Sequence, residues 1–94
     1  MTAPDVVVSG RLQLGLLACL ATRGEVAFSD LATLLETTNG ALSVQLKRLE
    51  EMGLVRLERG FLGRRPRTLA AITPTGRRAY QQCLDAMLRR TSSV

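Results

Sequence analysis

Apolar residues recur along the chain in four stretches with the three- and four-residue spacing of an amphipathic helix. Ser9 and Thr38 are expected to cap the first and third of these helices, and Gly53 to end the third. Thr73 followed by Pro74 is a strong start signal for the fourth. The pattern therefore predicts helices over residues 10–22, 31–36, 39–52 and about 74–90.

Three shorter segments alternate polar and apolar residues, as a half-buried strand does. Residues 25–28 would form a very short strand, and residues 54–59 and 68–72 the two arms of a hairpin. The hairpin tip is expected over residues 60–67, where two glycines and a proline interrupt the pattern. The predicted order is therefore α-β-α-α-β-β-α, a mostly helical α+β fold in which a hairpin, here called the wing, follows a helix-turn-helix.

The composition narrows the range of functions. With 13 Lys and Arg against 8 Asp and Glu, the chain carries a formal charge of +5, and its pI is near 10.6. This charge favours a polyanionic partner: nucleic acid, an anionic membrane surface or an acidic protein. The chain has no histidine and two cysteines, too few for a four-ligand zinc site, and its carboxylates are dispersed. We therefore expect no enzyme activity, no metal site and no cofactor.

The apolar content is high for one small domain. The chain of 94 residues is 46% apolar, with a mean hydropathy of +0.10. Its longest apolar run, residues 14–21, is far shorter than the ~20 residues that a membrane span requires, and Asp5 argues against a signal peptide. Two cysteines do not make a disulfide scaffold. We expect a cytoplasmic, nucleoid-associated protein without membrane contact, whose surplus apolar surface forms a subunit interface.

The second and third predicted helices are joined by a short turn, as in a helix-turn-helix, whose second helix enters the major groove of DNA. Opposite the buried stripe of Leu42, Leu46 and Leu49, this helix is small at its N-terminal end and basic further along. Val44 on that face would touch a thymine methyl group, unless it is one of the scattered hydrophobes common on surfaces. The predicted DNA contacts are Asn39, Gly40, Ala41, Ser43, Val44, Gln45, Lys47 and Arg48.

Five arginines and no lysine lie within twelve positions of the predicted hairpin, with Glu58 as the only acid. Such a cluster is often just a solvated loop. On a rigid hairpin directly after a helix-turn-helix, the guanidinium groups instead suit phosphate oxygens or a narrow, electronegative minor groove. The predicted wing contacts are Arg59, Arg64, Arg65 and Arg67.

The first and last predicted helices carry more apolar surface than one small domain needs. We interpret them as a helical layer shared by two copies of the chain; the alternative is that both close a single monomeric core. Two of these residues are cysteines, which we interpret as small core hydrophobes rather than a redox switch. The expected interface residues are Leu12, Leu16, Cys19, Tyr80, Cys83, Leu84, Met87 and Leu88.

The stretch from Arg11 to Leu88 resembles the winged-helix DNA-binding domains of small MarR/PadR-like bacterial transcriptional regulators. The resemblance rests on residues 42–55 (LSVQLKRLEEMGLV), residues 61–68 (FLGRRPRT) and residues 72–77 (ITPTGR). The spacing of the three segments is more specific than any one of them.

The resemblance implies a winged helix-turn-helix fold and a homodimer that reads a pseudo-palindromic operator. Recognition would come from residues 39–48, wing contacts from Arg64, Arg65 and Arg67, and dimerisation from the first and last helices. Full-length MarR proteins carry longer flanking helices around an effector pocket, so a small-molecule effector stays an open question here.

Two functions are consistent with these features of the sequence. The first is a sequence-specific regulator of transcription that binds double-stranded DNA, most simply a repressor that occludes a promoter. The second is a winged-helix interaction module whose arginine-rich wing docks an acidic protein. We divide the single domain, residues 1–94, into a loose arm (1–8), dimerisation helices (9–22 and 74–90), a helix-turn-helix (29–53) and a wing (54–72).

Overall fold

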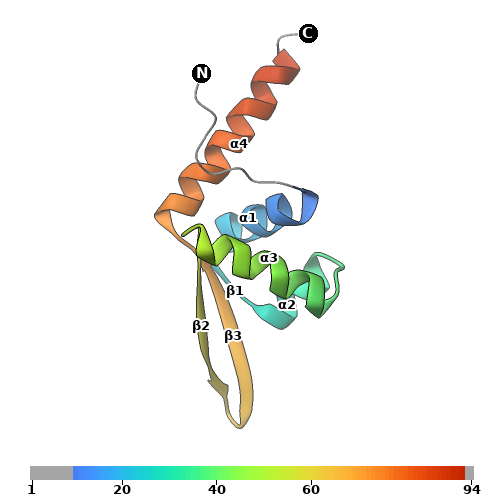
Figure 1. Cartoon of the computed structure of the whole chain (residues 1–94), viewed down its shortest axis with the longest axis vertical. Helices are drawn as coiled ribbons and strands as arrows, with labels where there is room; N and C mark the ends of the chain where they lie inside the picture. The colour runs from blue at the N-terminus through green and yellow to red at the C-terminus, as the bar shows by residue number, and fades with distance from the viewer. Residues whose placement is uncertain (1–9, 93–94) are drawn as a thin grey trace.

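The seven expected elements form in the expected order, so the α+β winged helix-turn-helix prediction is confirmed (Figure 1). The computed structural model describes residues 10–92, and the side chains as far as residue 89. Strands β1 and β2 both pair antiparallel with β3, in the sheet order β1-β3-β2. The elements are α1 (Arg11–Arg23), β1 (Glu25–Ala27), α2 (Phe28–Leu34), α3 (Asn39–Glu51), β2 (Val55–Leu62), β3 (Arg65–Ile72) and α4 (Pro74–Ser92).

The hydrophobic core is built mainly from leucines of α1, α2 and α3, packed on the inner face of the sheet. The predicted stripe of α3 is confirmed, because its three leucines have almost no exposed surface. Burial on this scale contributes roughly 1.5–3 kcal/mol per leucine. The fully buried large side chains are Leu16, Leu17, Leu20, Leu31, Leu42, Leu46, Leu49 and Leu54.

Both ends of α3 are fixed by local hydrogen bonds, to a side chain at its start and within the backbone at its end. At its start, the Thr38 hydroxyl accepts a hydrogen bond from the Ala41 amide at 3.1 Å, as predicted for an N-cap. At its end, Gly53 has a φ of 75° and donates to the Glu50 carbonyl, while the next amide donates to the Leu49 carbonyl, both at 2.9 Å. This pair of bonds is a Schellman motif, which requires a residue with positive φ.

Two predicted boundaries are wrong. Helix α2 begins at Phe28 and ends at Leu34, because the chain turns directly out of β1 with no side-chain cap. The predicted tip over residues 60–67 is in fact mostly strand: β2 and β3 pair over eight positions, up to Leu62 opposite Arg65. Ser9, the predicted cap of α1, and the arm over residues 1–8 lie outside the described residues.

A two-residue turn closes the long hairpin. Gly63 takes a φ of 66° at the first turn position, as in a type II′ turn, whose twist matches that of the flanking strands. Pro66 fits within β3 because β1 stops short of it and leaves that edge without a neighbouring strand.

The hairpin and the far half of α4 project from opposite ends of the helical body (Figure 1). The described chain measures 53 × 23 × 21 Å along its principal axes. No helix within residues 10–92 is long and apolar enough to cross a membrane. The fold thus presents a β-tip at one end and an amphipathic helix at the other.

Candidate nucleic-acid interface

The outward face of α3 is accessible over most of its predicted contacts. Val44, almost opposite the buried leucines, is 50% exposed. Small residues at the first turn leave the backbone of α3 open to close approach, and nothing lies within 4 Å of a Cβ built on Gly40. The predicted contacts found exposed are Asn39, Gly40, Ala41, Ser43, Val44, Lys47 and Arg48.

Gln45 differs from the other predicted contacts, because it is half-buried and faces α1. Its Oε1 accepts a hydrogen bond of 2.8 Å from Nε2 of Gln13, a side chain that is only 3% exposed. The bond joins two helices across 32 residues of sequence. We infer that Gln45 helps to position α3, and its contact with DNA stays a prediction. Sequence reasoning missed Gln13, whose one signal is a polar residue between two leucines.

Gln13→Ala is expected to lower the free energy of unfolding by about 1–2 kcal/mol, because the buried Gln13 side chain and its partly buried hydrogen bond are lost and the polar group of Gln45 is left facing α1. Chemical denaturation followed by circular dichroism measures the change. Gln81→Ala is the matched control: Gln81 also donates to a side chain, Asp85, but on the exposed face of α4, where the loss should stay below about 0.5 kcal/mol. Equal losses in the two variants would contradict a structural role for the buried bond.

A hollow of about 250 Å³ joins α3 to the base of the hairpin. Ser43, Lys47 and Glu50 line it from α3, and Arg59 and Thr68 from the wing. The outward face of the helix and one face of the hairpin therefore form one continuous surface. Glu50, which sequence reasoning did not place at the interface, adds a carboxylate to this otherwise basic region.

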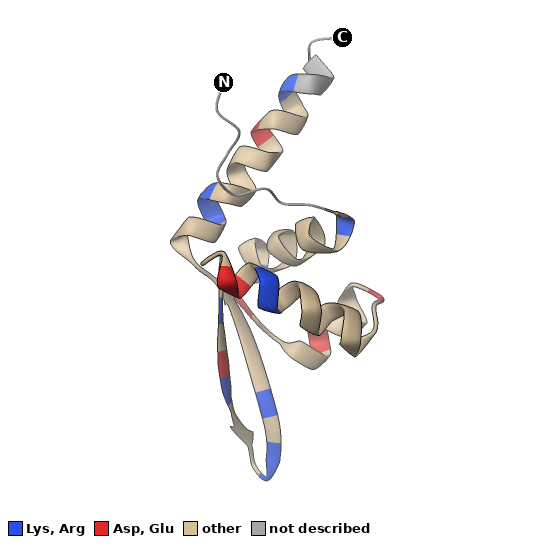
Figure 2. Ribbon diagram, viewed as in Figure 1, with Lys and Arg blue, Asp and Glu red and all other residues tan. Residues whose placement is uncertain are grey.

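The arginines of the hairpin lie along both of its strands and at the turn (Figure 2). Arg64 lies in the turn and Arg65 at the first position of β3, and both are exposed. Among the acidic residues only Glu58 lies on the wing, where it forms an exposed ion pair of 3.2 Å with Arg56; none follows it until Asp85. The tip is therefore cationic and free of neighbouring carboxylates.

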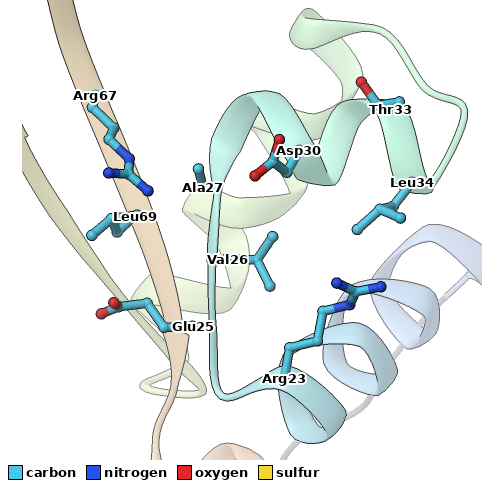
Figure 3. A pocket seen from close by; sticks show the side chains of 9 residues that line it. All are labelled: Arg23, Glu25, Val26, Ala27, Asp30, Thr33, Leu34, Arg67 and Leu69. Atoms are coloured by element: carbon cyan, nitrogen blue, oxygen red, sulfur yellow. The ribbon is translucent and has the colours of Figure 1, made fainter. Parts of the chain in front are cut away.

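Arg67 lies on the other face of the hairpin from Arg59, beside the edge formed by β1 and α2. Figure 3 shows its guanidinium group pointing from β3 into a hollow of about 410 Å³, toward the side of α2 that carries Asp30. Arg23 and Glu25 also line this hollow, so both signs of charge meet there. Arg67 thus belongs to the flank of the wing, whereas Arg64 and Arg65 form its tip.

The predicted interface residues fall into three groups. Leu16 has no exposed surface within one chain, so its assignment to an interface between chains is wrong: it belongs to the subunit core. The half-buried ones are Leu12, Cys19, Tyr80, Cys83 and Leu84, of which the first three pack against that core. Further along α4, Met87 is 47% and Leu88 65% exposed.

No group of three or more potential metal ligands occurs within the described part of the chain. Both cysteines are free thiols, half-buried on α1 and α4. Apart from the carboxylates of Glu50 and Glu58, the surface of α3 and the wing offers mainly guanidinium, ammonium, hydroxyl and small apolar groups, which suit binding to phosphates and base edges.

The packing of α2 and α3 beside a protruding hairpin defines a winged helix-turn-helix domain. The family model described as winged helix DNA-binding domain matches residues 12–91, so the chain belongs to this family. No protein of curated function matches the sequence significantly.

Solved structures of transcriptional regulators share this fold. A transcriptional regulator homologue from Pyrococcus horikoshii OT3 has 29% identity and a TM-score of 0.79, with 85% of this chain and 79% of that chain covered. NadR, solved in complex with 4-hydroxyphenylacetate, has 26% identity and a TM-score of 0.74, with 89% and 59% covered. AntR, an antimony-specific transcriptional repressor, has 25% identity and a TM-score of 0.71, with 92% and 75% covered. The resemblance to MarR/PadR-like regulators is thereby confirmed.

Proposed function

We propose that the protein is a sequence-specific regulator of transcription that binds double-stranded DNA as a homodimer. In this proposal α3 enters the major groove, the wing tip contacts the backbone and minor groove, and the operator is pseudo-palindromic. The simplest regulatory effect is repression by occlusion of a promoter. The observation that carries the proposal is the continuous surface formed by the exposed face of α3, the hollow beside Lys47 and Arg59, and the cationic hairpin.

The exposed residues of α3 match the chemistry of the major groove. Gly40 and Ser43 allow the helix to approach base edges closely, and Val44 would contact a thymine methyl group. Arg48 and Lys47, one to two turns further on, reach guanine or phosphate oxygens. The small, apolar N-terminal end of α3 therefore suits the reading of bases, and its basic end suits anchoring to phosphates.

The homodimer is supported by the distribution of burial along α4. Its apolar stripe packs on the subunit core at Ala79 and Tyr80 but continues past that core to Met87 and Leu88. A helix that extends an apolar stripe beyond its own domain favours a second copy as the partner that covers it. Two-fold symmetry would place two α3 helices about one DNA turn, roughly 34–36 Å, apart.

The proposal predicts different consequences for wing and helix substitutions. Arg64→Ala and Arg65→Ala should weaken binding to all duplexes to a similar extent and lower the salt slope by about 1 each, because phosphate contacts carry no sequence information. Val44→Ala and Arg48→Ala should instead change which duplex is preferred, by about 1–3 kcal/mol at the contacted base pair. Fluorescence anisotropy with a duplex selected from a random pool, and with its scrambled version, measures both effects.

Salt and symmetry separate this function from docking onto an acidic protein. A dimer that contacts several phosphates should lose orders of magnitude in affinity between about 50 and 200 mM salt, and should select two-fold related half-sites. If the selection returns no enriched duplex, or if all four variants lose affinity equally on both duplexes, the proposed readout by α3 is wrong.

A further inference from the structure

The two most exposed large apolar side chains beside the wing turn are Phe61, 75% exposed, and Leu62, 64% exposed. They lie at the end of β2 farthest from the core, beyond the reach of α3 and α4 (Figure 1). Neither side chain contributes to the hydrophobic core. Exposing a phenylalanine and a leucine to water at a protruding tip does not stabilise the fold, so their position points to a partner.

The strand pairing presents an apolar group on each face of the tip. Phe61 stands opposite Pro66 and Leu62 opposite Arg65, and successive strand residues point to opposite faces. Phe61 shares its face with Arg59, which lines the hollow beside α3. The apolar tip therefore continues the surface that runs from the outward side of α3 down the wing.

The charge around the tip selects the kind of partner. Arg64 in the turn and Arg65 beside it flank the two apolar residues, and no acidic residue lies between Glu58 and Asp85. A partner that binds both the guanidinium groups and the apolar side chains of the tip must be a polyanion with apolar groups just behind its charged surface. The minor groove of DNA has this composition, with phosphates at its rims and stacked bases at its floor.

The shape of the tip agrees with that partner. A turn of two residues closes the hairpin, so Phe61 and Leu62 lie at its narrowest end. The minor groove of B-DNA is roughly 6 Å wide, narrower than a β-ribbon with its side chains, so entry of these residues requires the groove to widen as the duplex is deformed. Apolar side chains that enter between base pairs from the minor groove unstack the step and kink the duplex toward the major groove. The major groove is the side that α3 is proposed to occupy.

We propose that Phe61 and Leu62 form an apolar wedge that enters the minor groove, partly unstacks a base step and bends the bound duplex. This inference rests on the proposed function and adds an activity to it: the protein deforms the DNA that it reads. Sequence preference at the wing would then come from the ease of unstacking, with flexible steps such as TA or CA/TG favoured where the tip inserts.

The bend can be measured apart from the affinity. A duplex of about 22 base pairs, roughly 75 Å long and short against the persistence length of DNA, carries a donor and an acceptor dye at its ends and the selected site at its centre. With the wild-type chain at saturation, energy transfer should rise to a value that corresponds to a bend of roughly 20–90°. The Phe61→Ala/Leu62→Ala variant should bind within about tenfold of wild type yet lose more than half of the bend, because its arginines remain.

Leu34→Ala is the matched control, since Leu34 is an apolar side chain on α2, 46% exposed, on the helical body rather than the wing tip. It should leave both bend and affinity unchanged. Circular dichroism should show the same melting curve for wild type and the tip variant, because the removed side chains are exposed.

The outcomes separate the wedge from the function on which it rests. Binding of the duplex with equal energy transfer in wild type and the tip variant would overturn the wedge and leave the proposed function standing. Failure of the wild-type chain to bind any duplex would overturn both. Co-sedimentation of the wild-type chain, but not of the tip variant, with phosphatidylglycerol vesicles, combined with an unbent duplex, would show that the tip inserts into an anionic membrane and would also overturn the wedge.

Discussion

Gly76→Ala is expected to lower the free energy of unfolding by about 3–5 kcal/mol, a large fraction of the stability of a domain of this size. A Cβ at this position would lie 2.9 Å from Cγ1 of Ile72 and closer still to the carbonyl oxygen of Leu54. The second neighbour is backbone, so it cannot swing away as the end of a flexible side chain does. Accommodating the methyl group requires α4 to move as a whole.

The close approach at Gly76 is held by a set of hydrogen bonds around Thr73. The Thr73 amide donates to the Leu54 carbonyl at 3.0 Å, and its hydroxyl donates to the Gly53 carbonyl at 2.6 Å. The same hydroxyl accepts a hydrogen bond from the Gly76 amide at 2.9 Å, which caps α4. Moving α4 to relieve the clash would break these hydrogen bonds, so the variant would lose stability from both poorer packing and lost hydrogen bonds.

Urea denaturation of wild type and variant measures the change in unfolding free energy. Gly40→Ala is the matched control, because nothing lies within 4 Å of a Cβ built at that helical position. It should stabilise the chain by up to about 1 kcal/mol through the lower entropy of the unfolded state. A Gly76→Ala variant that unfolds within 1 kcal/mol of wild type would show that the start of α4 is not held against Leu54.

Local signals in the sequence predicted the helices well, because each depends on residues a few positions apart. Thr38 and Gly53 mark the ends of α3 through bonds to residues within four positions. Helix α2 was misplaced because its start, after β1, has no side-chain cap to recognise. The length of the hairpin was underestimated because Gly60 suggested a turn, whereas pairing with the opposite strand keeps it within β2.

The candidate site could be predicted only in part, because the placement of some of its residues depends on partners far away in the sequence. The exposure of Val44 and Arg48 follows from their angle to the leucine stripe within one helix. The turning of Gln45 toward α1 depends on Gln13, 32 positions away, and no periodicity reveals such a partner. Burial of Leu16 within the subunit likewise depends on how many neighbours the fold places around α1, which the helix pattern does not specify.

The second large effect concerns the proposed dimer. Leu88→Glu is expected to convert it to a monomer and to weaken binding to the selected two-fold operator by roughly 10²–10⁴-fold, because each half-site then binds alone. Leu88 is 65% exposed in one subunit, so a carboxylate there should not disturb the fold of the monomer. Within a two-fold contact, by contrast, two such carboxylates would be desolvated near each other.

Sedimentation equilibrium and anisotropy titrations measure the two effects on the same samples. The wild-type chain should have twice the monomer mass of 10.2 kDa at micromolar concentration, and Leu88→Glu the monomer mass. Gln82→Glu is the matched control, because it places the same added charge on the exposed opposite side of α4. This variant should remain dimeric, with operator affinity within a few-fold of wild type, since a charge distant from the interface acts only through screened electrostatics. Binding to a duplex with one half-site should be nearly equal for all three proteins, since each α3 and wing is intact. A wild-type monomer in low salt, or a Leu88→Glu variant that still binds the two-fold operator as wild type does, would rule out α4 as the helix that joins the two copies.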